Sequence, residues 1–497
     1  MKILGIDVGS SSVKVSVLDA LTGISIASSY SPASEMAIIA LKPGWAEQDP
    51  DVWYMNLINA IRGVFNDTGI DPGEIEAIGI SYQMHGLVIV DGNLKPVRHS
   101  IIWCDSRAVE IGNNAFGVIG SDYCISNLLN SPGNFTASKL AWVKENEPAL
   151  YKRIHKVMLP GDYIAMKLTG ELSTTISGLS EGVLWDFKEE AISDRLMDYF
   201  GFDREMIPEL VPVFGLQGRI TRVASDETGL KAGTPVTYRS GDQPNNALSL
   251  KVLHPGEVAA TSGTSGVIYG VTDRSVTDLK SRVNVFAHVN HSRENKRFGV
   301  LACINGAGIM NSWARRITGG RWGYDEMNLK AASVPPGSDG LTVYPFGNGA
   351  ERILGNIDPG ASLSGLNLNI HTENHIYRAI QEAVAYSFRY SFDIMTELGM
   401  DISIIRAGNA NMFLSPLFRQ LVSDLTGAEL QLFNTDGATG AARGAAMGIG
   451  YYSDDREAFA GMRQLGATEP HKDNAILYSE LYKKWKNQLE KELPALL

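Results

Sequence analysis

One kind of turn occurs twice in this chain between strand-like segments, and this duplication most constrains the fold. Near the start, apolar residues alternate at period two on both sides of Gly9-Ser10-Ser11-Ser12, which predicts a β-hairpin. The second case is Thr261 to Gly266, which lies between Glu257-Val258-Ala259-Ala260 and Val267-Ile268-Tyr269. A phosphate loop that joins a strand to a helix is excluded for the first turn, because a strand follows it. The repeat suggests two paired domains of one design.

Helical and strand-like patterns alternate through both halves of the chain. Trp53 to Phe65 has helical spacing and precedes Ile78-Gly79-Ile80-Ser81, while Tyr377 to Leu398 precedes Ile402 to Arg406. This alternation predicts an α/β fold. A length of 497 residues also exceeds what one hydrophobic core supports, so two domains are expected.

The crossover between the domains is expected within Pro235 to Leu250, where Gly241-Asp242-Gln243-Pro244 interrupts the pattern. Glycine and proline are the strongest local signals for a break in regular structure. We therefore place a first domain at residues 1–246 and a second at 247–497.

Charge and cysteine content exclude several classes of protein. Lys and Arg total 44 against 55 Asp and Glu, a net charge of -11, which disfavours nucleic acid and membrane surfaces as partners. No secretory signal or apolar run of about 18 residues occurs, so a cytoplasmic location is expected. Cys104, Cys124 and Cys303 lack the spacing of a zinc site and are interpreted as reduced thiols.

Asp7 ends the first strand, and Gly9 two residues later opens the turn that continues with Ser10, Ser11 and Ser12. Backbone N–H groups and hydroxyls in such a turn can face a polyphosphate, while the carboxylate is expected to hold the Mg²⁺ ion through a retained water. On these residues alone, a tight hairpin without a ligand is the better interpretation. The second hairpin, with Gly263, Thr264 and Ser265, favours a nucleotide held by two closing domains.

A third glycine-containing stretch, Ala407-Gly408-Asn409-Ala410-Asn411, follows the strand-like Ile402 to Ile405. Gly408 and Asn409 would let the backbone approach an adenine or ribose closely. A plain connection from a strand to a helix explains these residues about equally well.

Asp242 is the candidate catalytic carboxylate, in Ser240-Gly241-Asp242 at the expected junction of the domains. Most surface Asp residues have no such role. Between two closing domains, however, a carboxylate can accept the proton of a substrate hydroxyl as its oxygen attacks a γ-phosphate.

Polar residues follow several apolar strands of the first half, at Gln83-Met84-His85, at Trp103 to Arg107 with Asp105 among them, and at Asp162. Strand ends in an open α/β domain are where a polyol would be bound. Singly, His85 is better read as a core histidine and Trp103 as a packed aromatic. Their shared placement favours a sugar pocket.

The chain resembles the FGGY carbohydrate kinases over nearly its whole length. The resemblance is carried by ordered blocks: GIDVGSSSVKV at the start, GWAEQDPDVW from Gly44, SYQMHGLVIVD from Ser81, IIWCDSRA from Ile101, FTASKLAWV from Phe135, LPGDYIAMKLTGEL from Leu159, TSGTSGV from Thr261, Gly349-Ala350-Glu351-Arg352, and DGATGAARGAA from Asp436.

The resemblance implies two ribonuclease-H-like domains of the actin-like ATPase type on either side of a catalytic cleft, with ATP and Mg²⁺ as cofactors. Position by position, it implies that Asp242 is the general base, that Asp7 is the carboxylate associated with the metal, and that Met84 and His85 contact the sugar.

The block Gln83-Met84-His85 points to a ketopentose, with D-xylulose ahead of D-ribulose and glycerol, and Asp105 is expected to help bind it. The sequence also leaves a homodimer as a possible assembly. The chain departs from the family's pattern at Tyr82, at Cys104, at Gln243-Pro244 and in the third loop, where Ala407-Gly408-Asn409-Ala410 replaces the family's GGGA.

Three rival functions remain at this stage. A kinase for another small sugar or polyol would share the chemistry and differ in the pocket. An actin-like ATPase that serves as a chaperone or a filament would not need the sugar residues. A catalytically dead sensor is disfavoured because Asp7 and Asp242 are both present.

Overall fold

A computed structural model describes residues 1–493 of the chain. The chain packs into two compact units, which interleave along the sequence. Unit 1 comprises residues 1–251, 286–298 and 435–462, and unit 2 comprises residues 252–285, 299–434 and the described residues from 463 onward. The boundary that we expected at residue 246 stays a prediction. The packing adds that two segments from the second half of the sequence belong to unit 1.

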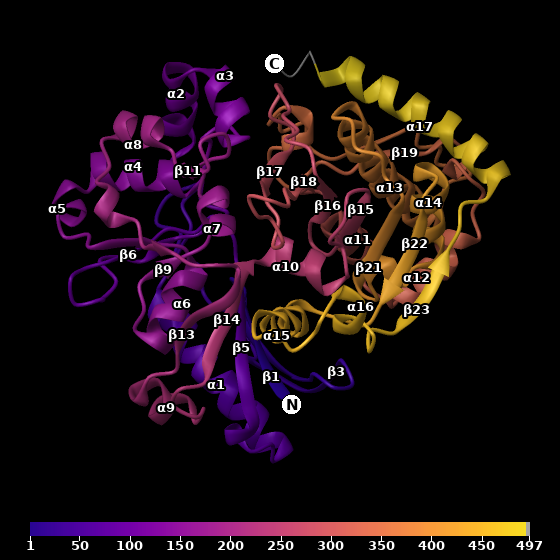
Figure 1. The fold of residues 1–497 in the computed structure, drawn as a ribbon. Helices are drawn as coiled ribbons and strands as arrows, with labels where there is room; N and C mark the ends of the chain where they lie inside the picture. The colour runs from indigo at the N-terminus through magenta and orange to yellow at the C-terminus, as the bar shows by residue number, and fades with distance from the viewer. Residues whose placement is uncertain (494–497) are drawn as a thin grey trace. The chain divides into compact units, whose positions relative to one another are not determined.

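The core of unit 1 is a six-stranded sheet in the order β13-β14-β5-β1-β2-β3 (Figure 1). β1 pairs antiparallel with β2, and β2 with β3, whereas β1, β5 and β14 run parallel as neighbours. The strands span Lys2–Val8 (β1), Val13–Asp19 (β2), Ile24–Ser31 (β3), Ile75–Tyr82 (β5), Phe214–Arg219 (β13) and Pro235–Gly241 (β14).

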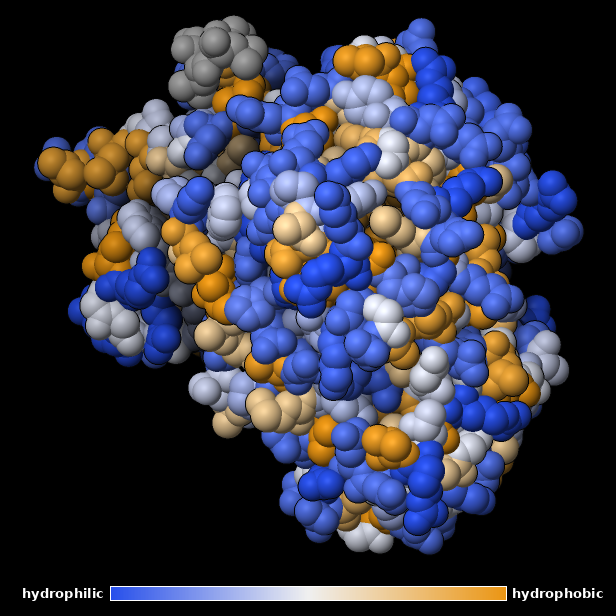
Figure 2. Space-filling model, turned by 90° about the vertical axis from the view of Figure 1, so that its left-hand side faces the viewer, coloured by the Kyte–Doolittle hydropathy of each residue, from blue (hydrophilic) through white to orange (hydrophobic). Residues whose placement is uncertain are grey.

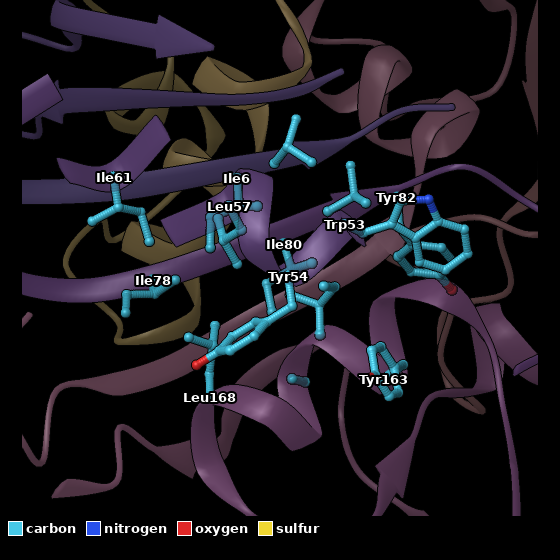
Figure 3. Close-up of a cluster of buried hydrophobic side chains, with 14 of the residues drawn as sticks. Ile6, Trp53, Tyr54, Leu57, Ile61, Ile78, Ile80, Tyr82, Tyr163 and Leu168 are labelled. Carbon is cyan, nitrogen blue, oxygen red and sulfur yellow. The ribbon is translucent and has the colours of Figure 1, made fainter. Parts of the chain in front are cut away.

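Helix α1 (Pro50–Thr68) and helix α6 (Pro160–Thr169) supply side chains to one hydrophobic cluster with this sheet. Asp49 caps the start of α1 through the N–H of Asp51, and Gly69 ends the helix in the left-handed conformation, both ordinary helix signals. Figure 3 shows this cluster. It joins strand residues such as Ile6 and Ile80 to helix residues.

Helix α15 (Gly437–Gly448) contacts the same sheet through residues without large side chains. A Cβ atom added at Gly5 would collide with the carbonyl of Ala438, and one added at Gly79 with the carbonyl of Ala441. Because successive strand residues point to opposite faces, these glycines leave one face open to α15 while their neighbours face α1. The small residues of DGATGAARGAA therefore permit a close approach of helix and sheet.

The remaining elements of unit 1 surround this sheet. The elements that position the candidate site are β4 (Glu47–Gln48), β7 (Ser100–Ile101), α4 (Thr136–Asn146), α7 (Ile176–Glu181) and α10 (Asp242–Ser249). Further elements are β6 (Val88–Val90), α2 (Val109–Ile119), β8 (Lys156–Met158), α8 (Asp194–Phe200) and α9 (Arg222–Thr228).

Unit 2 repeats the plan with a seven-stranded sheet in the order β17-β18-β16-β15-β21-β22-β23. β15 pairs antiparallel with β16 and parallel with β21, as β1 does with β2 and β5. The strands span Glu257–Ser262 (β15), Gly266–Thr272 (β16), Asn284–Ala287 (β17), Phe298–Ile304 (β18), Ile404–Gly408 (β21), Glu429–Phe433 (β22) and Gln464–Thr468 (β23). Its helices include α11 (Gly308–Ile317), α12 (Tyr324–Ala332), α13 (Glu373–Glu397), α14 (Pro416–Thr426) and α17 (Lys472–Glu492).

The structure confirms the predicted fold class, an α/β protein of two ribonuclease-H-like units, and both predicted hairpins. The face seen in Figure 2 is mostly hydrophilic, with hydrophobic residues scattered among the polar ones. Within residues 1–493, no helix is long and apolar enough to span a bilayer.

Candidate active site

Three neighbouring parallel strands of unit 1 deliver the candidate catalytic and sugar-binding residues to one edge of the sheet. Val8 of β1 pairs with Tyr82 of β5, and Tyr82 pairs with Gly241 of β14. Asp7 therefore lies beside the points where β5 continues into Gln83 and β14 into Asp242. The carboxyl ends of parallel strands are the usual place for a ligand site in an open α/β sheet.

Asp7 is held by its neighbour on β5 and by the start of α15. Its Oδ1 accepts a hydrogen bond from the Ser81 hydroxyl at 2.8 Å, and a Cβ atom at Gly437 would collide with its Oδ2. Burial raises the pKa of Asp7, and the nearby carboxylate of Asp436 raises it further. The glycine at the helix start thus leaves room for the Asp7 carboxylate itself.

Asp242 is the first residue of α10, directly after β14. Burial raises the pKa of Asp242 to about 7, with the charge of Asp7 as the second cause. A carboxylate that titrates near neutral pH is suited to accept a proton from a hydroxyl and to return it later.

Gln83 belongs to a polar chain that reaches the first hairpin turn. Its backbone N–H donates to the Val8 carbonyl at 2.8 Å, and its side chain donates to Gln48 Oε1 at 3.4 Å. Gln48 in turn donates to the Ser10 carbonyl at 2.7 Å. Inside the turn, the Gly9 N–H donates to the Ser12 carbonyl at 3.0 Å. The predicted sugar-binding and phosphate-binding segments are therefore linked within unit 1.

His85 occupies a left-handed backbone conformation, with φ at 62°. Its Nδ1 lies 3.0 Å from the Glu181 carbonyl oxygen, and its ring packs against Phe135 and Phe286, with centroids 4.8 and 5.3 Å away. An unfavourable backbone conformation fixed by so many contacts is typical of a functional position.

Lys139 of α4 supports the loop that contains His85. Its Nζ donates to the carbonyls of His85 and Ile102, at 2.8 and 3.0 Å. Burial lowers the pKa of Lys139 to about 7, against the opposing effect of Asp105. The ammonium group therefore ties together the chain segments that follow β5 and β7.

Asp105 is fully buried, and its carboxylate is already occupied by protein groups. It accepts from the Ala46 N–H at 2.6 Å and pairs with Arg107, whose NH2 group lies 2.7 Å away. Arg107 stacks on Trp45 at 3.8 Å from the ring centroid. These contacts favour a role in ordering the loop over the direct sugar contact predicted for Asp105, which stays an untested prediction.

Two further parts of this region escaped the sequence-based prediction. Phe286, which packs on His85, lies about 200 residues further along the chain in β17, whose last two residues pack with unit 1 although the strand belongs to the sheet of unit 2. Nothing in its sequence pattern links it to unit 1. Glu181 lies at the end of α7 in the run Ser177-Gly178-Leu179-Ser180-Glu181-Gly182. No apolar strand precedes it directly, so the strand-end signal that marked the other residues is missing.

Unit 2 brings the second and third glycine-rich loops together. Gly263, Thr264 and Ser265 form the turn between β15 and β16, and Gly408 ends the adjacent β21. Beyond it, the Asn409 N–H donates to the Phe433 carbonyl at 3.0 Å. An added Cβ at Gly263 would lie 3.5 Å from the side-chain nitrogen of Asn411. The predicted nucleotide-binding residues of unit 2 thus share one sheet edge.

Within the described residues 1–493, no group of three or more His, Cys, Asp or Glu side chains could hold a metal ion by itself. Mg²⁺ often keeps several waters and uses one or two carboxylates together with substrate phosphates. Asp7 offers a half-buried carboxylate of the kind that this mode of binding uses.

Two ribonuclease-H-like units in one chain place this protein in the actin-like ATPase class of folds. The sequence comparison specifies the family. A model of the N-terminal domain of the FGGY family of carbohydrate kinases matches residues 2–249, and a model of its C-terminal domain matches residues 258–451. The chain belongs to this family and is a carbohydrate kinase, which uses ATP as a substrate.

Sequence identity to individual relatives is low. The chain is 27% identical to the xylulose kinase of Bacillus subtilis, over 98% of this chain and 96% of that one. Its fold is similar to the ligand-bound xylulose kinase of Lactobacillus acidophilus, with a TM-score of 0.90 at 21% identity, covering 99% of this chain and 98% of the other. It is also similar to the gluconate kinase of the same organism, with a TM-score of 0.89 at 21% identity, covering 100% and 99%. At such identities, the structural likeness establishes the fold alone.

Proposed function

We propose that this kinase transfers the γ-phosphoryl group of ATP to the terminal hydroxyl of a ketopentose, D-xylulose, and releases D-xylulose 5-phosphate. One observation carries the proposal. The parallel strands β1, β5 and β14 bring Asp7, Met84 and Asp242 to the same edge of unit 1. The names of the B. subtilis and L. acidophilus relatives support the choice of sugar.

Asp242 is the proposed general base. A pKa of about 7 keeps much of this carboxylate ionised at neutral pH and leaves it basic enough to take the proton of the attacking hydroxyl. Met84 and His85 stand at the end of the neighbouring strand, where they would orient the sugar so that its terminal oxygen meets Asp242. Positioning and charge stabilisation are most of what phosphoryl transfer requires from a protein.

Nucleotide binding is assigned to the glycine-rich turns. Ser10, Ser11 and Ser12 follow Gly9 in unit 1, while Gly263, Thr264, Ser265, Gly408 and Asn409 line one sheet edge of unit 2. Asp7 would hold Mg²⁺ through water. When bound, the ion offsets negative charge on the β- and γ-phosphates.

A kinase for another sugar or polyol is the rival, because the same fold occurs in a gluconate kinase. Tyr82 also bears on this choice, since its fully buried ring fills the space that a Cβ atom at Gly161 would need. The ring belongs to the hydrophobic cluster of unit 1, and Tyr82 directly precedes the sugar-binding segment Gln83-Met84-His85. An ATPase that needs no sugar would leave Met84 and His85 without a use.

ADP release with a panel of D-xylulose, D-ribulose, gluconate and glycerol tests the proposal. We expect D-xylulose to give the highest kcat/KM, by about a hundredfold or more over the others, because two unpaired buried polar groups would cost about that much. A ranking with another compound above D-xylulose would overturn the choice of sugar. ATP turnover that is equally fast without any sugar would favour the ATPase instead.

The cytoplasmic location and the homodimer expected from the sequence remain part of this proposal. A kinase that consumes ATP and an unphosphorylated sugar needs a compartment that supplies both, which supports the cytoplasmic location. Sedimentation of the purified protein would show whether it forms a homodimer.

A further inference from the structure

Glu181 is a buried carboxyl group that the roles proposed for Asp7 and Asp242 do not use. It is the last residue of α7 and is fully buried. Among the described residues, neither of its side-chain oxygens has a hydrogen-bond partner. A buried polar group without a partner is costly, so such a group usually has an unseen partner or a function.

The position of this carboxyl places it in the proposed sugar site. A Cβ atom added at Gly241 would collide with Oε2 of Glu181 and would lie 2.6 Å from Cγ of Met84. Gly241 directly precedes Asp242. The backbone of Glu181 meets His85 on the other side, through the 3.0 Å contact with its Nδ1. The carboxyl therefore lies among the residues assigned to the sugar and to the base.

The surroundings of Glu181 favour its protonated form. Burial raises its pKa well above the usual range, and the charges of Asp242 and Asp162 raise it further. The Tyr82 hydroxyl and the His85 contact act in the opposite direction. Other charged groups near the site are Arg239 and Lys139. Arg239 pairs with Asp162 at 3.0 Å, and the charge of Glu181 raises the pKa of Lys139. A carboxylic acid that stays neutral at neutral pH can donate a hydrogen bond.

We propose that Glu181 is a substrate-binding residue whose neutral carboxyl donates a hydrogen bond to a sugar oxygen near the end of the sugar that Asp242 activates. This inference rests on the proposed function and adds a specificity determinant to the same site. A site built to bond a hydroxyl or carbonyl rejects analogues that lack it, because its own polar group is then left unpaired.

The competing explanation is packing, in which Glu181 only fills space beside Gly241. Two variants of similar size separate these roles. Glu181→Gln keeps a donor and removes the ability to ionise, whereas Glu181→Met keeps the volume and removes both donor and acceptor. Thermal unfolding of each variant shows whether the fold is intact.

The experiment measures kcat and KM on the best sugar of the panel, together with calorimetric binding of that sugar without ATP. We expect Glu181→Gln to stay within about threefold of the parent chain, and Glu181→Met to lose about tenfold or more in kcat/KM and in sugar affinity. Equal activity and binding in Glu181→Met would overturn the proposal. So would a Glu181→Gln variant that is impaired as much as Glu181→Met, since an ionised acceptor would then be required.

A pH profile keeps the test decisive if Glu181→Met does not fold. In the parent chain, kcat/KM should fall at alkaline pH as Glu181 loses its proton, and Glu181→Gln should lack that decline. Identical alkaline limbs in the two proteins would contradict a neutral donor. The sugar ranking of the parent chain is measured separately, so failure of the D-xylulose assignment would be seen there and not in this comparison.

Discussion

Three carboxyl groups carry the proposed chemistry, those of Asp7, Glu181 and Asp242, and each has a raised pKa with burial as the largest cause. Asp7 and Asp242 were predictable because both lie at the end of a strand-like segment, Asp7 two residues before Gly9 and Asp242 directly after Gly241. Glu181 was not, since its burial and its approach to Gly241 depend on how α7 packs. Residue type and spacing therefore identify groups on strand ends, and contacts between distant elements determine the rest.

The titration of Asp242 leads to an expected pH dependence. Burial raises its pKa to about 7, and a general base acts only when it is deprotonated. We therefore expect kcat/KM for the sugar to fall as the pH is lowered through about 7, approaching a tenfold loss per pH unit. Initial rates of ADP release between about pH 5 and 8 check this. A rate that stays level down to pH 5 would show that no group of this kind limits the reaction.

At the scale of elements, periodicity predicted the regular structure well. The helical pattern of Trp53 to Phe65 lies inside α1, and that of Tyr377 to Leu398 coincides with α13 apart from its ends. The packing of α15 on the sheet could not be predicted in this way, because its small residues show no hydrophobic periodicity. Only the packing shows that they let the helix backbone approach Gly5 and Gly79.

Substitution of Gly79 tests this close approach. In Gly79→Ala, the new Cβ would meet the backbone carbonyl of Ala441, so either the helix or the sheet must shift. We expect a loss of about 1–3 kcal/mol in the free energy of unfolding, measured by denaturant titration. Gly92→Ala is the matched control in the same unit, since nothing lies within 4 Å of its added Cβ. Equal stability of the two variants would show that α15 does not need this contact.

At the scale of the whole molecule, the duplicated hairpin correctly predicted two units of one design. Each unit joins an antiparallel hairpin to parallel strands, and the glycine turns follow β1 and β15 in both. A single boundary near residue 246 follows sequence order, whereas residues 286–298 and 435–462 pack with unit 1. Composition and periodicity reflect only local preferences, so they could not predict that these distant segments pack with unit 1.

Sugar-dependent ADP release by Asp242→Asn, measured beside the parent chain, tests whether Asp242 is the general base of a sugar kinase. Asp122→Asn is the control, because Asp122 is an exposed residue of the same unit. We expect Asp242→Asn to lower kcat by at least about a hundredfold, with calorimetric binding of ATP and sugar nearly unchanged and with full activity in the control. Near-normal turnover by a folded Asp242→Asn variant would contradict the assignment of Asp242 as the base.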